Sequence, residues 1–513
     1  MSLEIILDRF IGKQFPTKED TDRLDYILTR ERLFKGENST VFFDALITRL
    51  CSAGVSFQEF LGDGNGSVIH SANSSIGKSR VEAMLRSYNL LKPICSVKNR
   101  FLFGKELIVK DINDERNAWI NGTDETPDDG FVDRTSLYTE LYRSGLGGQY
   151  RGDSILRLWK NEDGQAEISV VSAKYWFPVS YVEDSKKVLA NCIVEQYKGR
   201  DEDKIYKVIA SEKGTTYYFA ILSKDGNNTL IPWNEASLGK LPSSLVGSEI
   251  EYVNKEVTDL DYGVIFRIPT IPQDDSVYGT TDFDEACISE LREIFIRMTQ
   301  NSRIADKNTD PLMTGSASAI KEDEYGNTIV EMSGKFHVID KDDAPTTYVE
   351  FGGAMLDKST LIIKEAIETI YGMTNVNASA LGSTQESMSA LTGTAIEKVY
   401  ATPISEGNRQ WQLWRPVISN MLKCARQMEK GVNDLNPQLE RESGLPKTDM
   451  ETLEITLAKN GKQPVISHLE SIKKANVGIS DKQANIEYDR ILKEQVDREG
   501  ISPINANEID FGV

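Results

Sequence analysis

The sequence predicts an α+β protein, and three observations support this fold class. Segments with apolar residues at helical spacing occupy both ends of the chain, and alternating apolar segments with turns lie between about residues 150 and 270. A shorter β-rich segment lies between two further helical patterns after residue 307. The 513 residues suggest about three domains, and 39% apolar residues are enough to bury a core in each.

The first 115 residues or so are predicted to be mainly helical. We expect helices near residues 20–33 and 80–92, and a strand at Phe101–Val109. Further along, segments such as SILRLWK and AEISVVS flank turns that contain Asp or Glu with Gly, which is typical of antiparallel hairpins. The glycines of GLGG, Gly145–Gly148, precede the first of these strands, so we interpret them as a hairpin turn rather than a phosphate-binding loop.

Two amphipathic helices are predicted around the second β-rich segment. The first begins near Thr281, whose hydroxyl suits a helix N-terminus, and its apolar face is Phe283, Cys287, Ile288, Leu291, Ile294, Phe295 and Met298. The second spans Asp357–Tyr371, with Gly372 placed to end it, and its apolar face is Leu361, Ile363, Ala366, Ile367 and Ile370. Between the two helices, residues 323–327 (DEYGN) are predicted to form a turn between β segments.

The segment Thr369–Ile396 carries one charge, Glu386, in 28 residues, whereas a chain with 27% charged residues should place about eight there. Its many Ser, Thr, Asn and Gly residues exclude a buried or membrane-spanning segment. A helical pattern then runs to about Lys430, in which Pro403 and Pro416 should each bend or break the helix. From about Gln463, the tail is expected to form two short helices.

Composition argues against several classes of function. The 79 acidic and 59 basic residues give a formal charge of −20 with no basic block, so simple electrostatic capture of nucleic acid is not expected. The five cysteines and three histidines are isolated, which predicts no metal site, no disulfide framework and no cofactor. No stretch reaches the length of a membrane span, and no export signal is recognised.

No set of residues predicts an active site. SSIGKS, Ser74–Ser79, is similar to the end of a phosphate-binding loop, but Ala72 stands where that loop requires glycine. The histidines lie in segments without a nearby nucleophile; His337, for example, alternates within the predicted strand KFHVID. We therefore expect that the protein is not an enzyme.

The order of four segments resembles the bacteriophage portal protein family, the head-to-tail connectors of tailed phages. LLKPICSVKNRFLFGKELIVKD resembles the family's apolar helix that runs into a strand, and SILRLWKNEDGQAEISVVSAKYWFPVSYVED resembles its wing hairpin. SELREIFIRMTQNSRIADKNTDPLMTG resembles the first stem helix entering the clip. ETIYGMTNVNASALGSTQESMSALTGTAIEKVYATP resembles the second stem helix, the tunnel loop and the start of the long wing helix. The match covers about residues 24–480.

The resemblance implies the portal fold, with a β-rich wing, a two-helix stem, a small β-containing clip, a tunnel loop, a long kinked wing helix and a helical crown. Carried over by segment, the expected bounds are a wing at 1–280 and 393–460, stem helices at 281–307 and 357–372, a clip at 308–356, a tunnel loop at 373–392 and a crown at 461–513.

The resemblance also implies a homo-oligomeric ring of about twelve subunits at one capsid vertex, through which double-stranded DNA is packaged and later ejected. The implied partners are the terminase large subunit, head-completion or adaptor proteins, and the major capsid and scaffolding proteins, with no membrane. The implied location is the virion, and the host cytoplasm during assembly. Two alternatives remain: another capsid-vertex, adaptor or tail protein of a phage, and, less favoured without a complete phosphate loop, a nucleotide-dependent packaging enzyme.

Two groups of candidate site residues follow from the resemblance, and neither is catalytic or metal-binding. The tunnel loop would place along the DNA path Asn375, Asn377, Ser379, Ser383, Thr384, Gln385 and Glu386, and the clip would dock partners through Asp323, Glu324, Tyr325 and Asn327. In a narrow bore, charges on neighbouring copies would lie within a Debye length of roughly 8–10 Å, which small uncharged residues avoid. A flexible linker between helices explains the same composition equally well.

Overall fold

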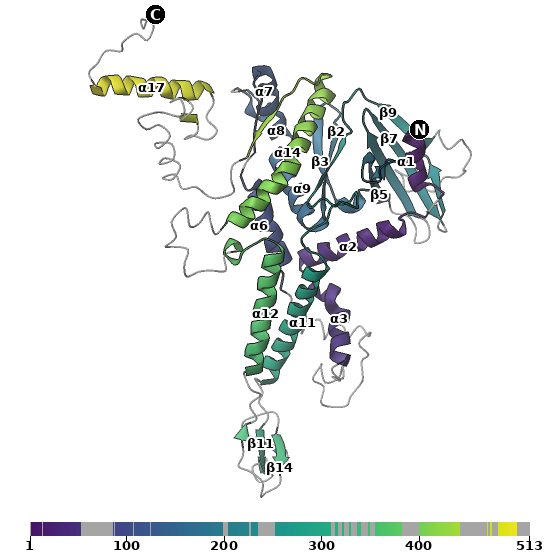
Figure 1. Ribbon diagram of the computed structural model, residues 1–513, viewed down its shortest axis with the longest axis vertical. Coiled ribbons are helices and arrows are strands. Elements are labelled where there is room, and N and C mark those ends of the chain that lie inside the picture. The colour runs from purple at the N-terminus through teal and green to yellow at the C-terminus, as the bar shows by residue number, and fades with distance from the viewer. Residues whose placement is uncertain are drawn as a thin grey trace, which may run out of the picture. The chain divides into compact units, whose positions relative to one another are not determined.

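The computed structural model is shown in Figure 1. It describes residues 2–12, 14–52, 86, 88–105, 107–123, 125–197, 204–224, 227–233, 252–308, 354–381, 400–441 and 481–499, together with short segments between 313 and 348 and residues 469 and 472–473. The chain divides into two compact units, Met1–Ile120 with Phe131–Gly444 and Asn121–Gly130 with Leu445–Val513. The mixture of helices and strands agrees with the α+β class predicted from the sequence. No helix among the described residues is long and apolar enough to cross a membrane.

Three helices begin the first unit: α1 (Ser2–Phe10), α2 (Lys18–Lys35) and α3 (Asn38–Ser52). Helix α2 confirms the helix expected at 20–33, and a capping box fixes its start, because the Thr17 hydroxyl accepts from the Asp20 amide while the Asp20 carboxylate accepts from the Thr17 amide. Gly36 ends α2 with a φ of 85°, a conformation that suits glycine.

Helix α6 (Leu91–Phe103) corrects two expectations. First, residues 88–90, which lie within the helix expected at 80–92, are not helical. Second, the strand expected from Phe101 begins only at β1 (Ile108–Lys110). The Asn89 side chain accepts from the Lys92 amide and marks the true helix start. Leu102 and Phe103 are fully buried on this helix, so tertiary packing decides the state of a segment that has high β propensity.

The glycines of GLGG lie inside helix α9 (Leu137–Arg151), so the hairpin turn expected there is wrong. A side chain at Gly145 would place its Cβ 2.5 Å from Asn99 Oδ1 and 2.9 Å from the Phe103 ring of α6. At Gly148, the Cβ would lie 2.2 Å from Ser154 Oγ. The glycines therefore allow α9 to approach α6 and the following strand closely.

Antiparallel hairpins form the two larger sheets, as the sequence predicts. The first sheet has the order β10 (Ile265–Pro269), β2 (Asp153–Lys160), β3 (Ala166–Val171). The second has the order β4 (Val179–Ser180), β5 (Val188–Tyr197), β6 (Lys204–Glu212), β7 (Thr215–Lys224), β8 (Asn227–Ile231), with β9 (Asn254–Val257) also paired to β7. Short helical elements of this region are α7 (Asp114–Asn121), η1 (Pro127–Asp129), α8 (Phe131–Arg134) and η2 (Ala173–Tyr175).

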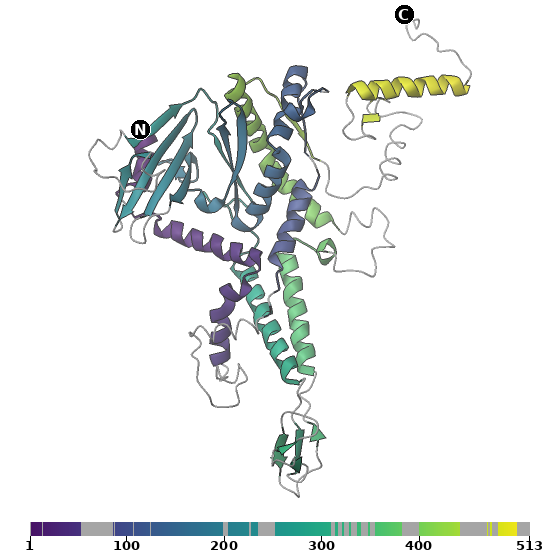
Figure 2. The same cartoon turned by 180° about the vertical axis from the view of Figure 1, so that it is seen from behind.

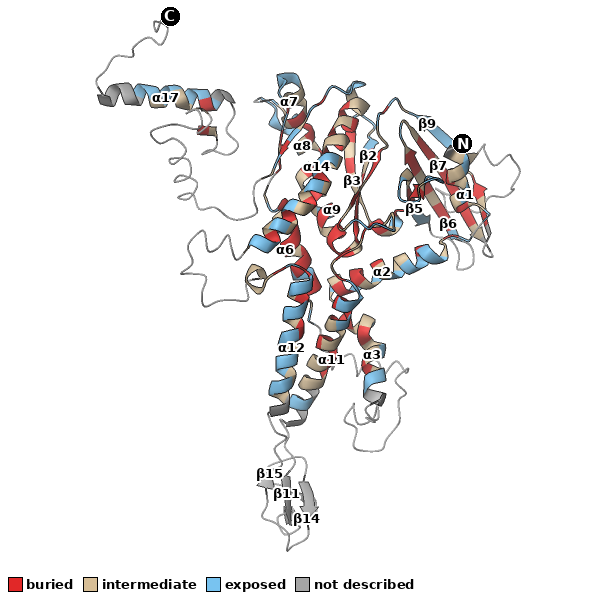
Figure 3. Cartoon of the chain, in the orientation of Figure 1, coloured by how far each residue is buried: buried red, intermediate tan, exposed pale blue. Residues whose placement is uncertain are grey.

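Among the described residues, three of the four hydrophobic clusters join several elements of the first unit. The largest joins the three-stranded sheet to α6, α9 and α14 (Ala401–Lys430), where Phe103 meets Trp414 edge to face at 4.8 Å. The second joins α2, α3, α6, α11 (Glu285–Asn308) and α12 (Ala354–Met373). The third packs α1 onto the six-stranded sheet, with Phe10 against Phe219. Figure 3 shows this burial on the facing sides of the elements.

Helices α11 and α12 lie side by side (Figures 1 and 2). Helix α11 begins later than expected, because its cap is Asp284, whose carboxylate accepts from the Cys287 amide at 2.8 Å, and not Thr281. Its expected apolar face is buried, except that Met298 is partly exposed. On α12, Ala366 and Ile370 are buried, but Leu361 is 56% exposed, so its assignment to the buried face is wrong.

The structure describes five short strands in the chain between α11 and α12. They are β11 (Met313–Ser316), β12 (Lys321–Glu322), β13 (Thr328–Ile329), β14 (Phe336–Ile339), which contains His337, and β15 (Thr347–Tyr348). Strand β11 pairs in parallel with β14 and antiparallel with β15. Strands β12 and β13 pair antiparallel, which confirms β segments on both sides of 323–327.

Helix α14 is the longest described helix, and only one of its two prolines lies in its interior. Pro403 lies in the first turn, where backbone N–H groups have no partner within the helix, so the break expected there is wrong. Pro416 lies in the interior, yet the helix continues to Lys430. After it, β16 (Gln438–Glu440) pairs with β1. In the second unit, α17 (Asp481–Glu499) confirms a helix in the tail.

Candidate functional site

Helix α12 ends in a Schellman motif that opens the uncharged segment. Asn375 has a φ of 55°, its amide donates to the Gly372 carbonyl at 3.3 Å, and the Val376 amide donates to the Tyr371 carbonyl at 3.1 Å. Gly372 lies inside the helix, so the residue that ends α12 is Asn375 and not Gly372, as the sequence suggested. Val376 is buried, which fixes the direction in which the chain leaves the helix.

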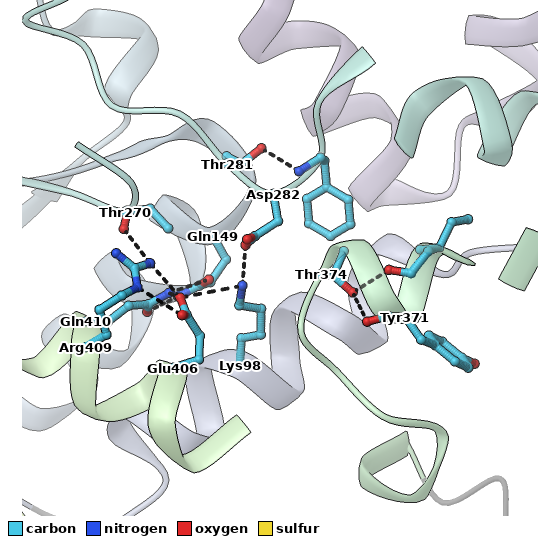
Figure 4. Close-up of polar contacts among 12 residues, drawn as sticks. Lys98, Gln149, Thr270, Thr281, Asp282, Tyr371, Thr374, Glu406, Arg409 and Gln410 are labelled. Carbon is cyan, nitrogen blue, oxygen red and sulfur yellow. Dashed lines mark hydrogen bonds and ion pairs between the residues drawn. The ribbon is translucent and has the colours of Figure 1, made fainter. Parts of the chain in front are cut away.

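A short 3₁₀ helix, η5 (Ala378–Leu381), follows directly. Asn377 caps it, because its side-chain oxygen accepts from the Ala380 amide at 3.0 Å. The side chain of Thr374 is completely buried, and its hydroxyl donates to the Ile370 carbonyl at 2.8 Å (Figure 4). The start of the uncharged segment is therefore ordered by its own side chains.

The two described ends of segment 382–399 meet. The Tyr400 hydroxyl donates to the Ser379 carbonyl at 3.3 Å, and the Tyr400 ring lies 5.9 Å from the Phe101 ring of α6. We call Thr374–Leu381 together with Tyr400 the loop base. Because its two parts are joined, the chain between them leaves and returns at one place on α6.

A pocket of about 370 Å³ separates η5 from α6. Its lining includes Lys92, Ser96 and Arg100, which follow one another at intervals of four residues along one side of α6, and Ala380 and Leu381 of η5. The residues that line it include two cations and no carboxylate. The pocket beside the loop base is thus locally basic in a chain whose net charge is −20.

Beside the loop base, a largely buried set of polar side chains joins four segments of the chain (Figure 4). We call it the junction network: Lys98, Gln149, Asp282, Glu406, Arg409 and Gln410. The Lys98 ammonium on α6 pairs with Asp282, just before α11, and lies 3.8 Å from Glu406 on α14. Its side chain is only 2% exposed, so these carboxylates replace the water that a charged group needs.

Helix α14 supplies the rest of the junction network. Arg409 donates to Glu406 at 2.6 Å and to the Thr270 carbonyl at 3.3 Å, while Gln410 exchanges a hydrogen bond of 2.7 Å with Gln149 of α9. Burial alone would raise the pKa of the Glu406 carboxyl, but the hydrogen bond from Arg409 and the charge of Lys98 hold that pKa below its ordinary value. Glu406 therefore stays charged, and the network fixes α14 to α6 and to the start of α11.

Chemically, this arrangement can position helices but shows no catalytic set. Within the part of the chain that the structure describes, no cluster of His, Cys, Asp and Glu could hold a metal ion. Cys95, Cys192, Cys287 and Cys424 are buried, and burial raises the pKa of each thiol, which disfavours the reactive thiolate.

The structure brings together three of the residues predicted for the tunnel loop: Asn375, Asn377 and Ser379 all lie in the loop base. The others, Ser383, Thr384, Gln385 and Glu386, lie outside the described residues, as do Asp323, Glu324, Tyr325 and Asn327 of the predicted clip.

Sequence reasoning missed the junction network and Tyr400. Two local signals were available in the sequence: a lysine in the apolar helix LLKPICSVKNRFLF, and the spacing of three residues between Glu406 and Arg409. The residues that contact them lie far away in the sequence, so the local pattern could not identify these partners.

Comparisons with known proteins give a likeness of low similarity among solved structures. No protein-family model matches the sequence, and no curated protein matches it. Among solved structures, the chain is similar to one described as "Neck of native GTA particle computed with C12 symmetry", with 11% identity and a TM-score of 0.37, over 82% of this chain and 98% of that one. A likeness of this size is too low to carry a function from one protein to the other.

Proposed function

We propose that the chain is the subunit of a phage portal, a ring-shaped channel for double-stranded DNA at one capsid vertex. The observation that carries the proposal is the order of elements from α11 to α14. A packed helix pair encloses a small β module in the chain, and the second helix leads into η5, where Ser379 is joined to Tyr400 at the far end of segment 382–399. A closed base lets such a loop extend from a rigid support, as a tunnel loop requires.

The exposed face of α12 supports assembly. Leu361 is 56% exposed and its neighbour Ile362 is 37% exposed on a helix whose main partner among the described elements is α11. Apolar side chains placed together on a helix surface are typical of a contact that is covered in an oligomer. In a ring of about twelve copies, every subunit would cover this face in the same way.

The strong negative charge suits a conduit for DNA. A net charge of −20 per chain becomes about −240 in about twelve copies, and like charge between wall and phosphate keeps DNA from binding the wall. A basic channel would release counterions from its cargo, bind it and stall it.

The proposed partners follow from this role. The β module between α11 and α12, residues 308–356 in the sequence prediction, would dock the terminase large subunit during packaging and head-completion proteins afterwards. The expected wing (1–280 and 393–460) and crown (461–513) would meet the major capsid and scaffolding proteins. The protein itself would hydrolyse no nucleotide, because terminase supplies that energy. Its place would be the virion, after assembly in the host cytoplasm.

Electron microscopy of the purified full-length chain, without nucleotide, tests the proposal. We expect closed rings of about twelve subunits with a central hole, together with a matching assembly mass. Monomers at every micromolar concentration and salt tested would contradict a portal and favour an adaptor or tail protein.

A further inference from the structure

We propose that the pocket between α6 and η5 binds the phosphate backbone of DNA. The inference rests on the proposed channel and names side chains that would contact DNA beside the loop base. We call Lys92, Ser96 and Arg100 the phosphate row, because they line the pocket along one side of α6.

The phosphate row consists of side chains without a partner. Lys92 and Arg100 are exposed, and neither forms an ion pair with another residue that the structure describes. The Ser96 hydroxyl lies between them on a half-buried residue and forms no hydrogen bond with a described residue. Lys92 also lies in the first turn of α6, where the helix dipole favours an anion. The row therefore offers an anion two cations and a hydroxyl donor that no other contact uses.

The acids beside α6 leave the phosphate row unpaired. Asp282 and Glu406 pair with Lys98, which lies two positions after Ser96 and therefore on the opposite side of the helix. Glu37 is exposed and follows Gly36, which lies against Asn89 of the lining, but Glu37 itself is not among the described lining residues. An anion that enters the pocket meets more positive than negative charge.

The remaining lining of the pocket suits a sugar. Pro93 and Val97 of α6 and Ala380 and Leu381 of η5 give it an apolar part. Each deoxyribose has a largely apolar face next to its phosphate, so a sugar can cover this part while the phosphates meet the cations. A volume of about 370 Å³ admits a short piece of backbone and not a folded domain.

The length of the phosphate row favours a chain of phosphates over a single anion. Lys92 and Arg100 are eight residues apart, which is about 12 Å along the helix axis. One phosphate or carboxylate reaches one of them at a time, whereas each DNA strand carries a charge about every 3.4 Å along its axis and can meet both. Contacts of Arg and Lys with phosphates position DNA without reading its sequence.

Such a contact is compatible with an acidic channel. The net charge of −20 already includes both cations of the row. The two strands of DNA wind around the duplex axis, so only some copies of a ring face a phosphate at one time. We therefore expect the row to centre moving DNA through weak contacts that salt screens, and not to hold the DNA in place.

The salt dependence of DNA binding tests the phosphate row in the assembled, full-length protein. The measurement is the affinity for a short labelled duplex over a series of salt concentrations. Lys92→Gln with Arg100→Gln should lower the slope of log affinity against log salt by about two for each occupied row, because each neutralised phosphate contributes about 0.9. An unchanged slope would overturn the proposal.

Two control variants show whether the charges and their position matter. Lys92→Arg with Arg100→Lys keeps both charges and should keep the slope. Lys160→Gln with Lys213→Gln removes two exposed lysines that do not line the pocket and should keep it as well. If this control lowered the slope as much as the change in the row, the effect would be one of general charge and the site would be wrong.

Competition separates DNA from other anions. Unlabelled duplex should displace the labelled duplex at a far lower phosphate concentration than inorganic phosphate does. Equal competition by inorganic phosphate would mean a site for small anions. Equal competition by a polyglutamate peptide of the same charge would mean an acidic protein partner. Either result would overturn the assignment to DNA.

Urea unfolding tests whether the chain itself occupies the row. Glu386 and Glu397, in segment 382–399, lie outside the described residues. We expect Lys92→Gln with Arg100→Gln to leave the urea midpoint unchanged, because exposed cations without a partner contribute little to stability. A lower midpoint would contradict the proposal, since it would mean that acids of the same chain already pair with the row.

Electron microscopy of the unmodified chain separates this inference from the proposed function. Rings whose DNA binding does not depend on the phosphate row would overturn the row and leave the portal assignment standing. Absence of rings would overturn the portal assignment. Duplex binding that still depends on Lys92 and Arg100 would then support the row as a DNA site of a protein that forms no ring.

Discussion

Single residues decide how the uncharged segment leaves α12. Asn375 adopts a left-handed conformation that few residues other than Gly and Asn accept, and Asn377 caps η5 through its side chain. The sequence singled out both residues because they are small, polar and uncharged. Their described contacts give them a local structural role, which is compatible with a place at the edge of a channel.

The first prediction concerns Asn375. Asn375→Ala should lower the free energy of unfolding by about 1 kcal/mol, because a Cβ-bearing residue without a polar group is disfavoured in the left-handed region, whereas Asn375→Gly should change it little. Urea unfolding followed by circular dichroism measures both. Equal losses for the two variants would mean that the Asn375 side chain, and not its backbone conformation, is what matters.

A second prediction at this scale concerns Lys98. Lys98→Met removes the cation between Asp282 and Glu406, both mostly buried, and should lower the free energy of unfolding by about 3–5 kcal/mol. Adding Asp282→Asn should recover part of this loss, since Glu406 keeps Arg409 as its cation and no buried carboxylate would then lack a partner. Arg143→Met, which breaks the exposed pair with Glu140, is the control and should cost less than about 1 kcal/mol.

At the scale of elements, close helix packing explains where the sequence reading was wrong. Glycines in GLGG suggested a turn, but Gly145 lies where α9 meets Asn99 and Phe103 of α6. The same crossing keeps Phe101–Phe103 helical against a preference for strand. On α14, Gly407 likewise approaches the Phe101 carbonyl, at 2.7 Å from an added Cβ. Helix α6 is therefore held by glycine contacts on two neighbours, and it supports the loop base.

The corresponding prediction compares two helical glycines. Gly145→Ala should lower the free energy of unfolding by about 1–3 kcal/mol, because the added methyl overpacks the α6–α9 contact. Gly372→Ala, on the exposed side of α12 with no atom within 4 Å, should raise it by up to about 1 kcal/mol through helix propensity. Thermal or urea unfolding of both variants is the measurement. Stabilisation by Gly145→Ala would contradict the close crossing of α6 and α9.

For the whole molecule, the proposed channel makes a prediction about DNA movement. Thr384→Lys with Gln385→Lys should leave ring assembly intact but shorten the DNA packaged at low salt, because added cations bind phosphates and salt weakens that binding. Packaged DNA length at two salt concentrations measures the effect.

Val182→Lys with Ser185→Lys adds the same charge at an exposed turn of the expected wing and is the control. If both double variants package equal lengths at both salts, segment 382–399 is a linker and does not line the bore.

The candidate site was only partly predictable. The lack of charge around Thr384 and the small polar residues before it drew attention to the segment that begins in the loop base, because composition is a local property of the chain. The Ser379–Tyr400 hydrogen bond and the Lys98–Asp282 pair were not predictable, since they join residues that are far apart in sequence.

The sequence by itself determined the helix–β module–helix order, the antiparallel hairpins and most of the buried face of α11, because periodicity and turn residues act over a few residues. Only the tertiary structure decided that GLGG is helical, that Leu361 faces outward and that Asp284, rather than Thr281, caps α11. Each of these depends on which other element lies within a few ångströms. The neighbouring element, and not the local sequence pattern, determines whether a glycine forms a turn or allows close helix packing. It also determines whether a leucine is buried in the core or exposed on the surface.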